Sequence, residues 1–267
     1  MLIDTHSHIY SEEFDEDQCD VIARAEAAGV GCIILPAIDS ESYGRQENLA
    51  NSRPDLFRQM IGLHPTSVKE NYKEALGLVQ KILFEHPEKY VGVGEIGLDF
   101  YWDTSFRKQQ LSALKQQICW AEELDKAVSL HLRNGKDCQP ENDAYTTLFN
   151  LLEHHGSTQY RGILHCFSGT LDNAMQAIKM GFFLGIGGVV TYKKSTLPAI
   201  IESVGLEHIV LETDSPYLAP VPYRGHRNES AYMEIVARKI ADITNCSLQT
   251  VAETTTNNVR CIFKELN

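Results

Sequence analysis

Short apolar runs alternate with longer amphipathic stretches along the whole chain, and this alternation repeats about eight times. The runs cover residues 2–3, 31–35, 59–63, 90–93, 128–130, 162–164, 182–186 and 208–211. Each run is short and almost wholly apolar, which is typical of a parallel strand buried on both faces. Between the runs, residues 70–85 carry apolar side chains at positions 75, 76, 79, 82 and 83, the spacing of one helix face. Residues 105–125 and 231–244 are also predicted to be helices.

Eight strand–helix units favour a closed barrel over an open doubly wound sheet, and right-handed crossovers allow either assembly. No G-x-G-x-x-G string follows the first run, so a dinucleotide-binding fold loses its main support. We therefore predict an α/β fold, a (β/α)8 TIM barrel. The glycines at 185, 187 and 188 are expected to serve tight packing and not phosphate binding, because no P-loop lysine follows them. The chain has no Ser- or Pro-rich linker, which predicts one domain over residues 1–267.

Composition narrows the class of protein. Hydrophobic residues make up 43% of the 267 residues and charged residues 22%, so a large core is expected. The formal net charge of −12 argues against a protein that coats nucleic acid over a broad basic face. It leaves room for an enzyme that grips one or two phosphates, because bound divalent cations can supply positive charge.

Cysteine usage and the start of the sequence indicate the compartment. The seven cysteines include no C-x-x-C spacing, which fits reduced thiols better than a disulfide framework. The first residues show neither the basic nor the apolar region of a secretory signal, and no apolar stretch is long enough to span a bilayer. We expect a soluble cytoplasmic protein with no membrane association and no obligate protein partner.

Residues that bind metals or move protons follow six of the eight runs. They are His6 and His8, His64, Glu95, His131, His165, and the pair Glu212 and Asp214. In a barrel of parallel strands, the carboxyl ends of all strands converge on one mouth, where active sites lie. The predicted topology therefore brings these distant residues together.

Each of these residues has an ordinary structural alternative. An H-x-H pair such as His6 and His8 is a weak signal alone, and a single histidine after a strand is more often hydrogen-bonded in the core. Glu95 at the end of an apolar strand needs a partner, which can be a basic side chain or shared cations. Glu212 and Asp214 lie two residues apart on one face, where adjacent carboxylates raise a pKa unless a cation is present.

Four histidines and two carboxylates, taken together, suit two divalent cations better than one. They are His6, His8, His131, His165, Glu95 and Asp214. Imidazole favours Zn²⁺ or Mn²⁺ over Mg²⁺, which stays possible. Six ligands exceed the needs of one tetrahedral ion, but they suit two ions bridged by a carboxylate, about 3.5–4 Å apart. Such a pair would activate a water, and Asp214 is our candidate for the general base that accepts the proton of that water.

Further candidates surround the mouth. His64 is a candidate to hydrogen-bond a phosphate or to protonate a leaving oxygen, with a helix-capping role as the alternative. The candidates for phosphate contacts are Arg133, Arg224 and Arg227, because a guanidinium matches phosphate oxygens. Each arginine has a loop salt bridge as its alternative.

Other residues near the strand ends are expected to support the site. Glu212 is expected to orient a water or a ligand histidine, and Asp99 to stabilise the loop after Glu95. Cys166 alternates with His165, which predicts that it faces the helices as a core residue. Tyr101 and Trp102 could stack on an unpaired base, although loop packing is the preferred interpretation.

The sequence also resembles the TatD-related deoxyribonucleases of the metal-dependent hydrolase superfamily, over almost its whole length. The matching strings are IDTHSH at residues 3–8, GLHP at 62–65, GEIGLDF at 94–100, LHLR at 130–133, HCFSG at 165–169, ETDSPYL at 212–218 and RGHRNE at 224–229. The resemblance implies a TIM-barrel, metal-dependent DNase that removes nucleotides from a 3′ end. Ser230 departs from the proline that usually follows the last string, which puts the shape of that loop in doubt.

The resemblance also implies a ligand set, with His6, His8 and Asp214 on one ion, Glu95 bridging, and His131 and His165 on the second ion. DNA phosphodiester hydrolysis, with DNA as the bound partner, is the leading function. One alternative is hydrolysis of an ester, amide or phosphotriester bond in a small molecule, because the scaffold serves many substrates. Another is a non-catalytic protein that keeps the metal site for binding.

Overall fold

Every apolar run of the sequence forms a strand, and the strands build one ring. The computed structural model describes residues 1–137, 139–156 and 159–266. Neighbouring strands are parallel and follow chain order from β1 to β8. Backbone contacts join the last strand to the first, where the Thr5 amide donates to the Leu211 carbonyl at 3.1 Å and Ser7 pairs with Ser215. The strands are β1 (Leu2–Asp4), β2 (Val30–Leu35), β3 (Phe57–Ile61), β4 (Tyr90–Asp99), β5 (Ala127–Arg133), β6 (Gly162–His165), β7 (Phe182–Ile186) and β8 (Ile209–Leu211).

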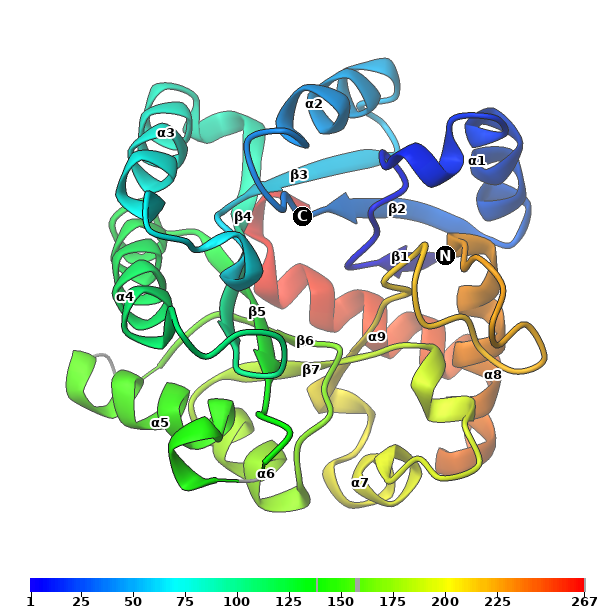
Figure 1. Cartoon of the computed structure of the whole chain (residues 1–267). Helices are drawn as coiled ribbons and strands as arrows, with labels where there is room; N and C mark the ends of the chain where they lie inside the picture. Colours follow the sequence, from blue (N-terminus) through cyan, green and yellow to red (C-terminus); the bar gives the residue numbers. More distant parts are fainter. Residues whose placement is uncertain (138, 157–158, 267) are drawn as a thin grey trace.

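Helices alternate with the strands and surround them, which confirms the predicted (β/α)8 barrel (Figure 1). They are α1 (Gln18–Ala27), α2 (Tyr43–Ser52), α3 (Tyr72–Glu85), α4 (Arg107–Glu123), α5 (Ala144–His155), α6 (Leu171–Lys179), α7 (Leu197–Val204), α8 (Met233–Thr244) and α9 (Leu248–Ile262). The predicted helices 70–85, 105–125 and 231–244 correspond to α3, α4 and α8. Each helix begins slightly later than predicted, and α4 also ends slightly earlier. Within the described ranges, no helix is both long and apolar enough to cross a bilayer.

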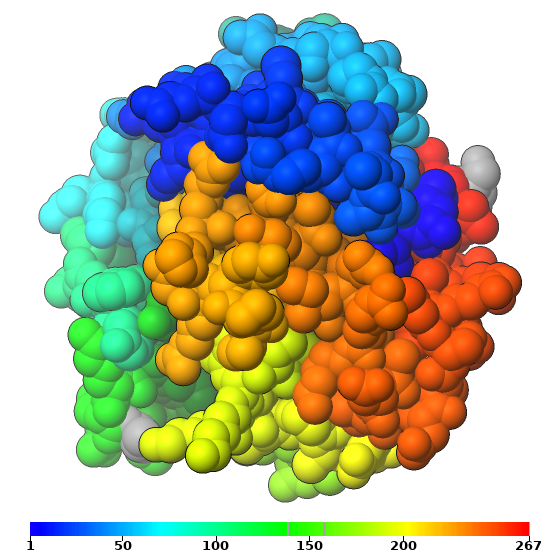
Figure 2. All heavy atoms as spheres, turned by 90° about the vertical axis from the view of Figure 1, so that its right-hand side faces the viewer, coloured from blue at the N-terminus to red at the C-terminus, as the bar shows by residue number. Residues whose placement is uncertain are grey.

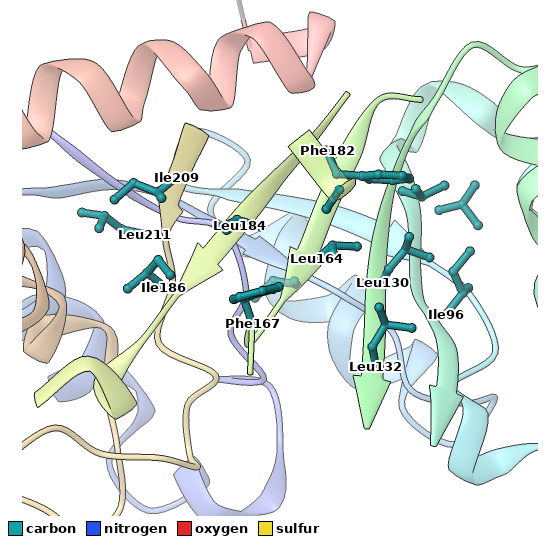
Figure 3. Close-up of a cluster of buried hydrophobic side chains, with 14 of the residues drawn as sticks. Ile96, Leu130, Leu132, Leu164, Phe167, Phe182, Leu184, Ile186, Ile209 and Leu211 are labelled. Carbon is teal, nitrogen blue, oxygen red and sulfur yellow. The ribbon is translucent and has the colours of Figure 1, made fainter. Parts of the chain in front are cut away.

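Apolar side chains form two layers, one outside the sheet and one inside it. The outer layer packs the strands against the helices, and Figure 3 shows its members on β4 to β8, including Ile96, Leu130, Leu164 and Leu184. The inner layer joins strand residues to the last helix, and its buried members are Ile3, Cys32, Ile34, Met60, Val91, Ala127, Ile163, Val210, Val259, Ile262 and Phe263. Helix α9 therefore closes the amino-terminal end of the barrel and leaves the opposite end for polar side chains (Figure 1).

Period-two alternation carries polar residues from the inner layer to the carboxyl-terminal mouth. On β6, Leu164 belongs to the outer layer, whereas Ile163 belongs to the inner layer and is followed on the same face by His165. On β5, Ser129 and His131 likewise share a face, and His131 is the register partner of His165. The expectation that these two histidines end neighbouring strands at equivalent positions is confirmed.

Strand β4 is longer than the apolar run that predicted it. The run covered residues 90–93, but the strand continues to Asp99 and every one of its residues is buried. The glycines at 92, 94 and 97 interrupt the apolar pattern, so the sequence alone did not show the full length. At Gly94 a Cβ would crowd Ser129 of the neighbouring strand, which explains the absence of a side chain. The extension places Glu95 inside the mouth.

Candidate metal centre

The carboxyl-terminal mouth of the barrel contains a cavity of about 710 Å³. Among the side chains that line it are His8, Glu95, His131, His165 and Asp214, which come from the ends of five different strands. His6 lies just beneath, fully buried, with its ring stacked on that of His165 at a centroid distance of 3.3 Å. The structure thus brings together all six residues that the sequence suggested as metal ligands.

The Glu95 carboxylate lies between two groups of imidazoles. Its Oε2 is 3.1 Å from His6 Nε2 and 3.7 Å from His8 Nε2. Its Oε1 is 3.0 Å from His131 Nδ1 and 3.9 Å from His165 Nε2. His64 Nε2 lies 3.4 Å from the same Oε1, so the two oxygens face separate groups of histidines.

Asp214 lies on the other side of the same space. Its Oδ1 is 3.5 Å from His165 Nε2, 3.7 Å from His8 Nε2 and 3.9 Å from His6 Nε2. The residue adopts the left-handed backbone conformation, with φ of 58°, and its amide donates to the His6 carbonyl at 2.9 Å. A non-glycine residue seldom adopts this conformation, and such residues cluster at functional sites.

Hydrogen bonds on the far side of two imidazoles fix which nitrogen faces the cavity. The Tyr10 hydroxyl donates its proton to the Pro36 carbonyl at 2.7 Å, so it can only accept from His8 Nδ1, which is 2.9 Å away. His165 Nδ1 is 3.0 Å from Glu212 Oε2, which is a pure acceptor when ionised. In both rings Nε2 is left to face Glu95 and Asp214, as is usual for metal-binding histidines. Tyr10 was not predicted, because nothing in its sequence context marks its hydroxyl.

Asp99 holds His131 in the same manner. Asp99 Oδ2 is 2.9 Å from His131 Nε2, while Oδ1 accepts the backbone N–H groups of Tyr101 and Trp102 at 2.9 and 3.2 Å. The expected role of Asp99 in stabilising its loop is confirmed, and the contact with His131 adds to it. His131 Nδ1 consequently points at Glu95.

His64 differs from these imidazoles in its hydrogen bonding. Its Nδ1 accepts the Thr66 amide N–H at 3.2 Å, which leaves Nε2 as the protonated nitrogen of the neutral ring. That Nε2 is 3.4 Å from Glu95 Oε1. His64 therefore presents a donor to the cavity, and it also caps the short turn that starts at Pro65.

Burial and neighbouring charges divide the pKa values of the cluster. Burial, aided by the charge of His165, lowers the pKa of His6 to about 3, so its ring is neutral and offers a lone pair. Burial alone would lower the pKa of His131, but hydrogen bonds with Asp99 and Glu95 outweigh it and raise the pKa to about 9. Burial alone would raise the pKa of Glu95, but the surrounding imidazoles hold that pKa well below its usual range. The carboxylate is thus ionised, and the surrounding imidazoles stabilise its charge.

The donor set fits divalent cations. Among the described residues, the ion-pair partners of Glu95 and Asp214 are all histidines, with no lysine or arginine. The neighbouring nitrogens His6 Nε2 and His8 Nε2 lie 3.2 Å apart and face the same space as the two carboxylates. Nitrogen and carboxylate ligands that converge without a basic partner are the chemistry of a Zn²⁺ or Mn²⁺ site. His6, His8 and Asp214 form one compact group, and His64, Glu95 and His131 form another.

A buried carboxylate ties the first and last strands together behind the ligands. Asp4 Oδ1 accepts from the Thr213 and His6 amides at 3.0 and 3.3 Å, and Oδ2 accepts from the Thr213 and Ser230 hydroxyls at 2.6 and 2.7 Å. Burial outweighs these hydrogen bonds and raises the pKa of Asp4 to about 6. Ser230 therefore supplies a donor that a proline at this position could not.

The three arginines suggested for phosphate contacts lie in different places. Arg133 lines the cavity. Arg224 lies outside the cavity lining and stacks on the Tyr192 ring, 4.5 Å from its centroid. Arg227 also lies outside and forms a salt bridge with Asp17 at 2.6 Å. Figure 2 shows the segment after β8, in orange, against the blue N-terminal residues, which is why Arg227 can reach Asp17.

The prediction for Cys166 is wrong. Its thiol lines the cavity and does not face the helices, because Cys166 follows the end of β6 and takes φ of 46°, which breaks the alternation of the strand. Glu212 holds this turn, since its Oε1 accepts the Cys166 amide at 2.6 Å. Gly185 makes room for Glu212, because a Cβ there would overlap the carboxylate. Tight packing at this glycine is therefore confirmed.

Known proteins resemble the chain over its full length. Residues 3–264 match the model of a family described as TatD related DNase. YabD of Bacillus subtilis, named an uncharacterized metal-dependent hydrolase, is 33% identical over 265 residues, with 99% of each chain covered. The crystal structure of the TatD homologue YjjV from Escherichia coli has a TM-score of 0.89 at 30% identity, covering 98% of both chains.

A further relative has a more specific name. A protein of Edwardsiella piscicida named 3′-5′ ssDNA/RNA exonuclease TatD is 27% identical over 269 residues, with 98% of both chains covered. The family match extends across the whole barrel and the strand ends that form the metal centre. The chain is therefore a metal-dependent hydrolase and belongs to the TatD-related DNase family.

Proposed function

We propose that this protein hydrolyses phosphodiester bonds in DNA and releases nucleotides from a 3′ end, with two divalent cations of Zn²⁺, Mn²⁺ or Mg²⁺. The observation that carries the proposal is the position of Glu95, whose two oxygens face separate groups of neutral or hydrogen-bonded imidazoles. The relative named a 3′-5′ ssDNA/RNA exonuclease supports the choice of substrate.

In this proposal the ligands fall into two sets that share Glu95. His6, His8 and Asp214 would hold one cation, and His131 and His165 would hold the other. The distances support this division, because Glu95 Oε2 lies nearer the first pair of histidines and Oε1 nearer the second. Bound cations in such a site supply Lewis acidity toward the phosphate and toward water.

The remaining groups act on protons and on the phosphate. Asp214 is the proposed general base, because its carboxylate borders the cavity and its side chain keeps 16% of its surface exposed. His64 donates from Nε2 to a phosphate oxygen or to the leaving oxygen, which fits the hydrogen bond at its Nδ1. Glu212 positions His165, and Arg133 contacts a phosphate from the cavity wall. Arg224 and Arg227 would reach a phosphate only on a longer strand that extends beyond the cavity.

A second candidate is hydrolysis of an ester, amide or phosphotriester bond in a small molecule. The observation that favours it is the cavity, which has the volume of a small-molecule site and takes only one of the three arginines suggested for phosphate binding. On this alternative the same metal centre acts on a neutral or singly charged substrate, and the acidic surface of the protein presents no obstacle.

The test uses metal-loaded protein with end-labelled single-stranded and duplex DNA, beside a panel of small esters, amides and phosphotriesters. We expect metal-dependent release of nucleotides and its loss in Glu95→Ala and Glu95→Gln, both checked for folding by circular dichroism. Glu88→Gln is the matched control, because Glu88 is exposed and lies outside the mouth. Turnover of the panel without release of nucleotides would overturn the nuclease proposal, and full activity of Glu95→Gln would overturn the site.

A further inference from the structure

The loop after β4 carries an exposed indole at the edge of the metal cavity. Trp102 is 66% exposed, although an aromatic side chain of this size is usually buried. It lines the metal cavity and also two smaller depressions beside that cavity. The neighbouring Tyr101 ring meets it edge to face, with centroids 5.0 Å apart. The indole therefore has a face that no protein group covers fully.

Two cations gather on these rings. The Arg133 guanidinium lies 4.0 Å from the Tyr101 centroid and 5.2 Å from the Trp102 centroid. Lys136 Nζ lies 4.2 Å from the Tyr101 centroid and 5.4 Å from that of Trp102. Within the described part of the chain, neither cation has a carboxylate as an ion-pair partner. Arg133 lines the metal cavity, and Lys136 lines one of the depressions beside it. In a chain with 36 acidic and 24 basic residues, two such cations around one indole indicate a place for an anion.

Asp99 joins this group to the metal centre. The carboxylate that holds the His131 imidazole also accepts the backbone N–H groups of Tyr101 and Trp102. The loop is thus fixed relative to a metal-facing histidine by one buried side chain, which is 2% exposed. Arg133 is two residues beyond His131 on the same face of β5, so its side chain starts from the same wall of the mouth.

We propose that Tyr101, Trp102, Arg133 and Lys136, here called the rim, hold the nucleotide next to the one being cleaved. An unpaired base stacks on the indole of Trp102, and the attached phosphate lies between Arg133 and Lys136. A base inside a duplex is already stacked on both sides and cannot use the indole, so the rim selects unpaired ends. This inference rests on the proposed function and assigns a preference for unpaired DNA ends to the rim.

The rim also explains how an acidic protein holds a polynucleotide. Arg133 and Lys136 bind one phosphate locally, while base stacking contributes an attraction that does not depend on the net charge of the protein. Removing one base–aromatic stack typically weakens binding about 10-fold. Trp102→Ala should therefore raise the KM for single-stranded DNA by about that factor and leave kcat nearly unchanged.

The two tryptophans make the stack directly observable. Trp102 is exposed, whereas Trp120 on α4 is only 3% exposed. Protein kept metal-free with EDTA is titrated with a single-stranded oligonucleotide, a blunt duplex of the same sequence and an abasic single strand, and indole fluorescence is followed. We expect quenching by the single strand only, and no quenching in Trp102→Phe or Trp102→Ala. Equal quenching by the duplex or the abasic strand would overturn the proposal.

Activity measurements separate this inference from the proposed function. Trp102→Ala and Lys136→Ala are compared with Lys81→Ala, whose exposed lysine lies in the second half of α3 and outside the cavity lining. We expect a higher KM for single-stranded DNA in the two rim variants and an unchanged KM in Lys81→Ala. Nucleotide release with no effect of either rim variant overturns the rim and keeps the nuclease. Quenching by single strands without any nucleotide release supports the rim as a binding site and overturns the nuclease.

Discussion

Replacing Tyr10 by phenylalanine should weaken metal binding without touching a ligand. The Tyr10 hydroxyl accepts from His8 Nδ1 because it gives its own proton to the Pro36 carbonyl. Without the hydroxyl, the His8 ring is free to carry its proton on Nε2, the nitrogen that faces Glu95 and Asp214. A protonated Nε2 has no lone pair for a cation, so binding must first move that proton.

The size of the effect follows from the burial of the two contacts. Tyr10 is 2% exposed, and its hydroxyl distances are 2.9 Å to His8 Nδ1 and 2.7 Å to the Pro36 oxygen. Phenylalanine keeps the ring in place and leaves two buried polar atoms without partners, at a cost of about 1–3 kcal/mol each. Loss of a group that orients a ligand imidazole typically lowers metal affinity about 10- to 100-fold. We expect this range for Tyr10→Phe.

The assay is competition between metal-stripped protein and a chromogenic chelator for Zn²⁺ or Mn²⁺. Urea unfolding in EDTA measures the stability of the same samples. Tyr160→Phe is the control, since its hydroxyl also donates to a backbone carbonyl, that of Leu152 at 2.9 Å, and within the described residues it makes no hydrogen bond to a histidine. Both variants should lose stability, and only Tyr10→Phe should lose metal affinity. Equal metal affinity in the wild type and both variants would refute the argument about the His8 proton.

Three further predictions concern the surroundings of the ligands. Metal binding at a pH between 6.5 and about 9 should release at least one proton. The reason is that His131 is protonated below its raised pKa in the metal-free protein and must be neutral to bind a cation. Calorimetry in buffers of different ionisation enthalpy measures this release, and identical heats in all buffers would contradict it. Ser230→Ala should lower the unfolding free energy by about 1–2 kcal/mol, since it leaves Asp4 Oδ2 with the Thr213 hydroxyl as its one remaining donor. Urea unfolding compares this variant with Ser203→Ala, which changes an exposed serine on α7. An equal loss of unfolding free energy in both variants would count against the role of Ser230. Gly185→Ala should lower both stability and metal affinity because its Cβ displaces the Glu212 carboxylate; Gly77→Ala, with open space around its Cα on α3, should leave metal affinity unchanged.

The sequence predicts the site well wherever a ligand follows a regular strand. His131 and His165 come after short apolar runs, and the period of a strand together with the convergence of strand ends places them on one wall of the mouth. Glu95 is also placed correctly, although its strand runs on to Asp99. A topology of parallel strands needs no knowledge of side-chain contacts to bring these residues together.

The prediction fails where the backbone leaves the strand. Cys166 takes a left-handed conformation directly after β6, so the alternation that would turn it outward no longer applies. Arg227 follows the last strand, but Asp17 holds it from near the start of the chain. No local pattern reports a partner 210 residues away, and no pattern marks the hydroxyl of Tyr10 as the acceptor that fixes His8.

The role of each histidine depends on what its second nitrogen contacts. His8 and His165 each donate from Nδ1 to an acceptor and so keep Nε2 as the nitrogen available to a cation. His64 instead accepts the Thr66 amide N–H at Nδ1 and so presents a proton at Nε2. Two rings of the same kind, both within 4 Å of Glu95, are thereby suited to opposite tasks, cation binding and hydrogen donation. Counting histidines in a motif cannot separate these tasks. The distinction lies in the group behind each ring: the Tyr10 hydroxyl for His8, the Glu212 carboxylate for His165 and the Thr66 amide for His64. An acceptor behind the ring leaves Nε2 for a cation, and a donor behind the ring leaves a proton on Nε2.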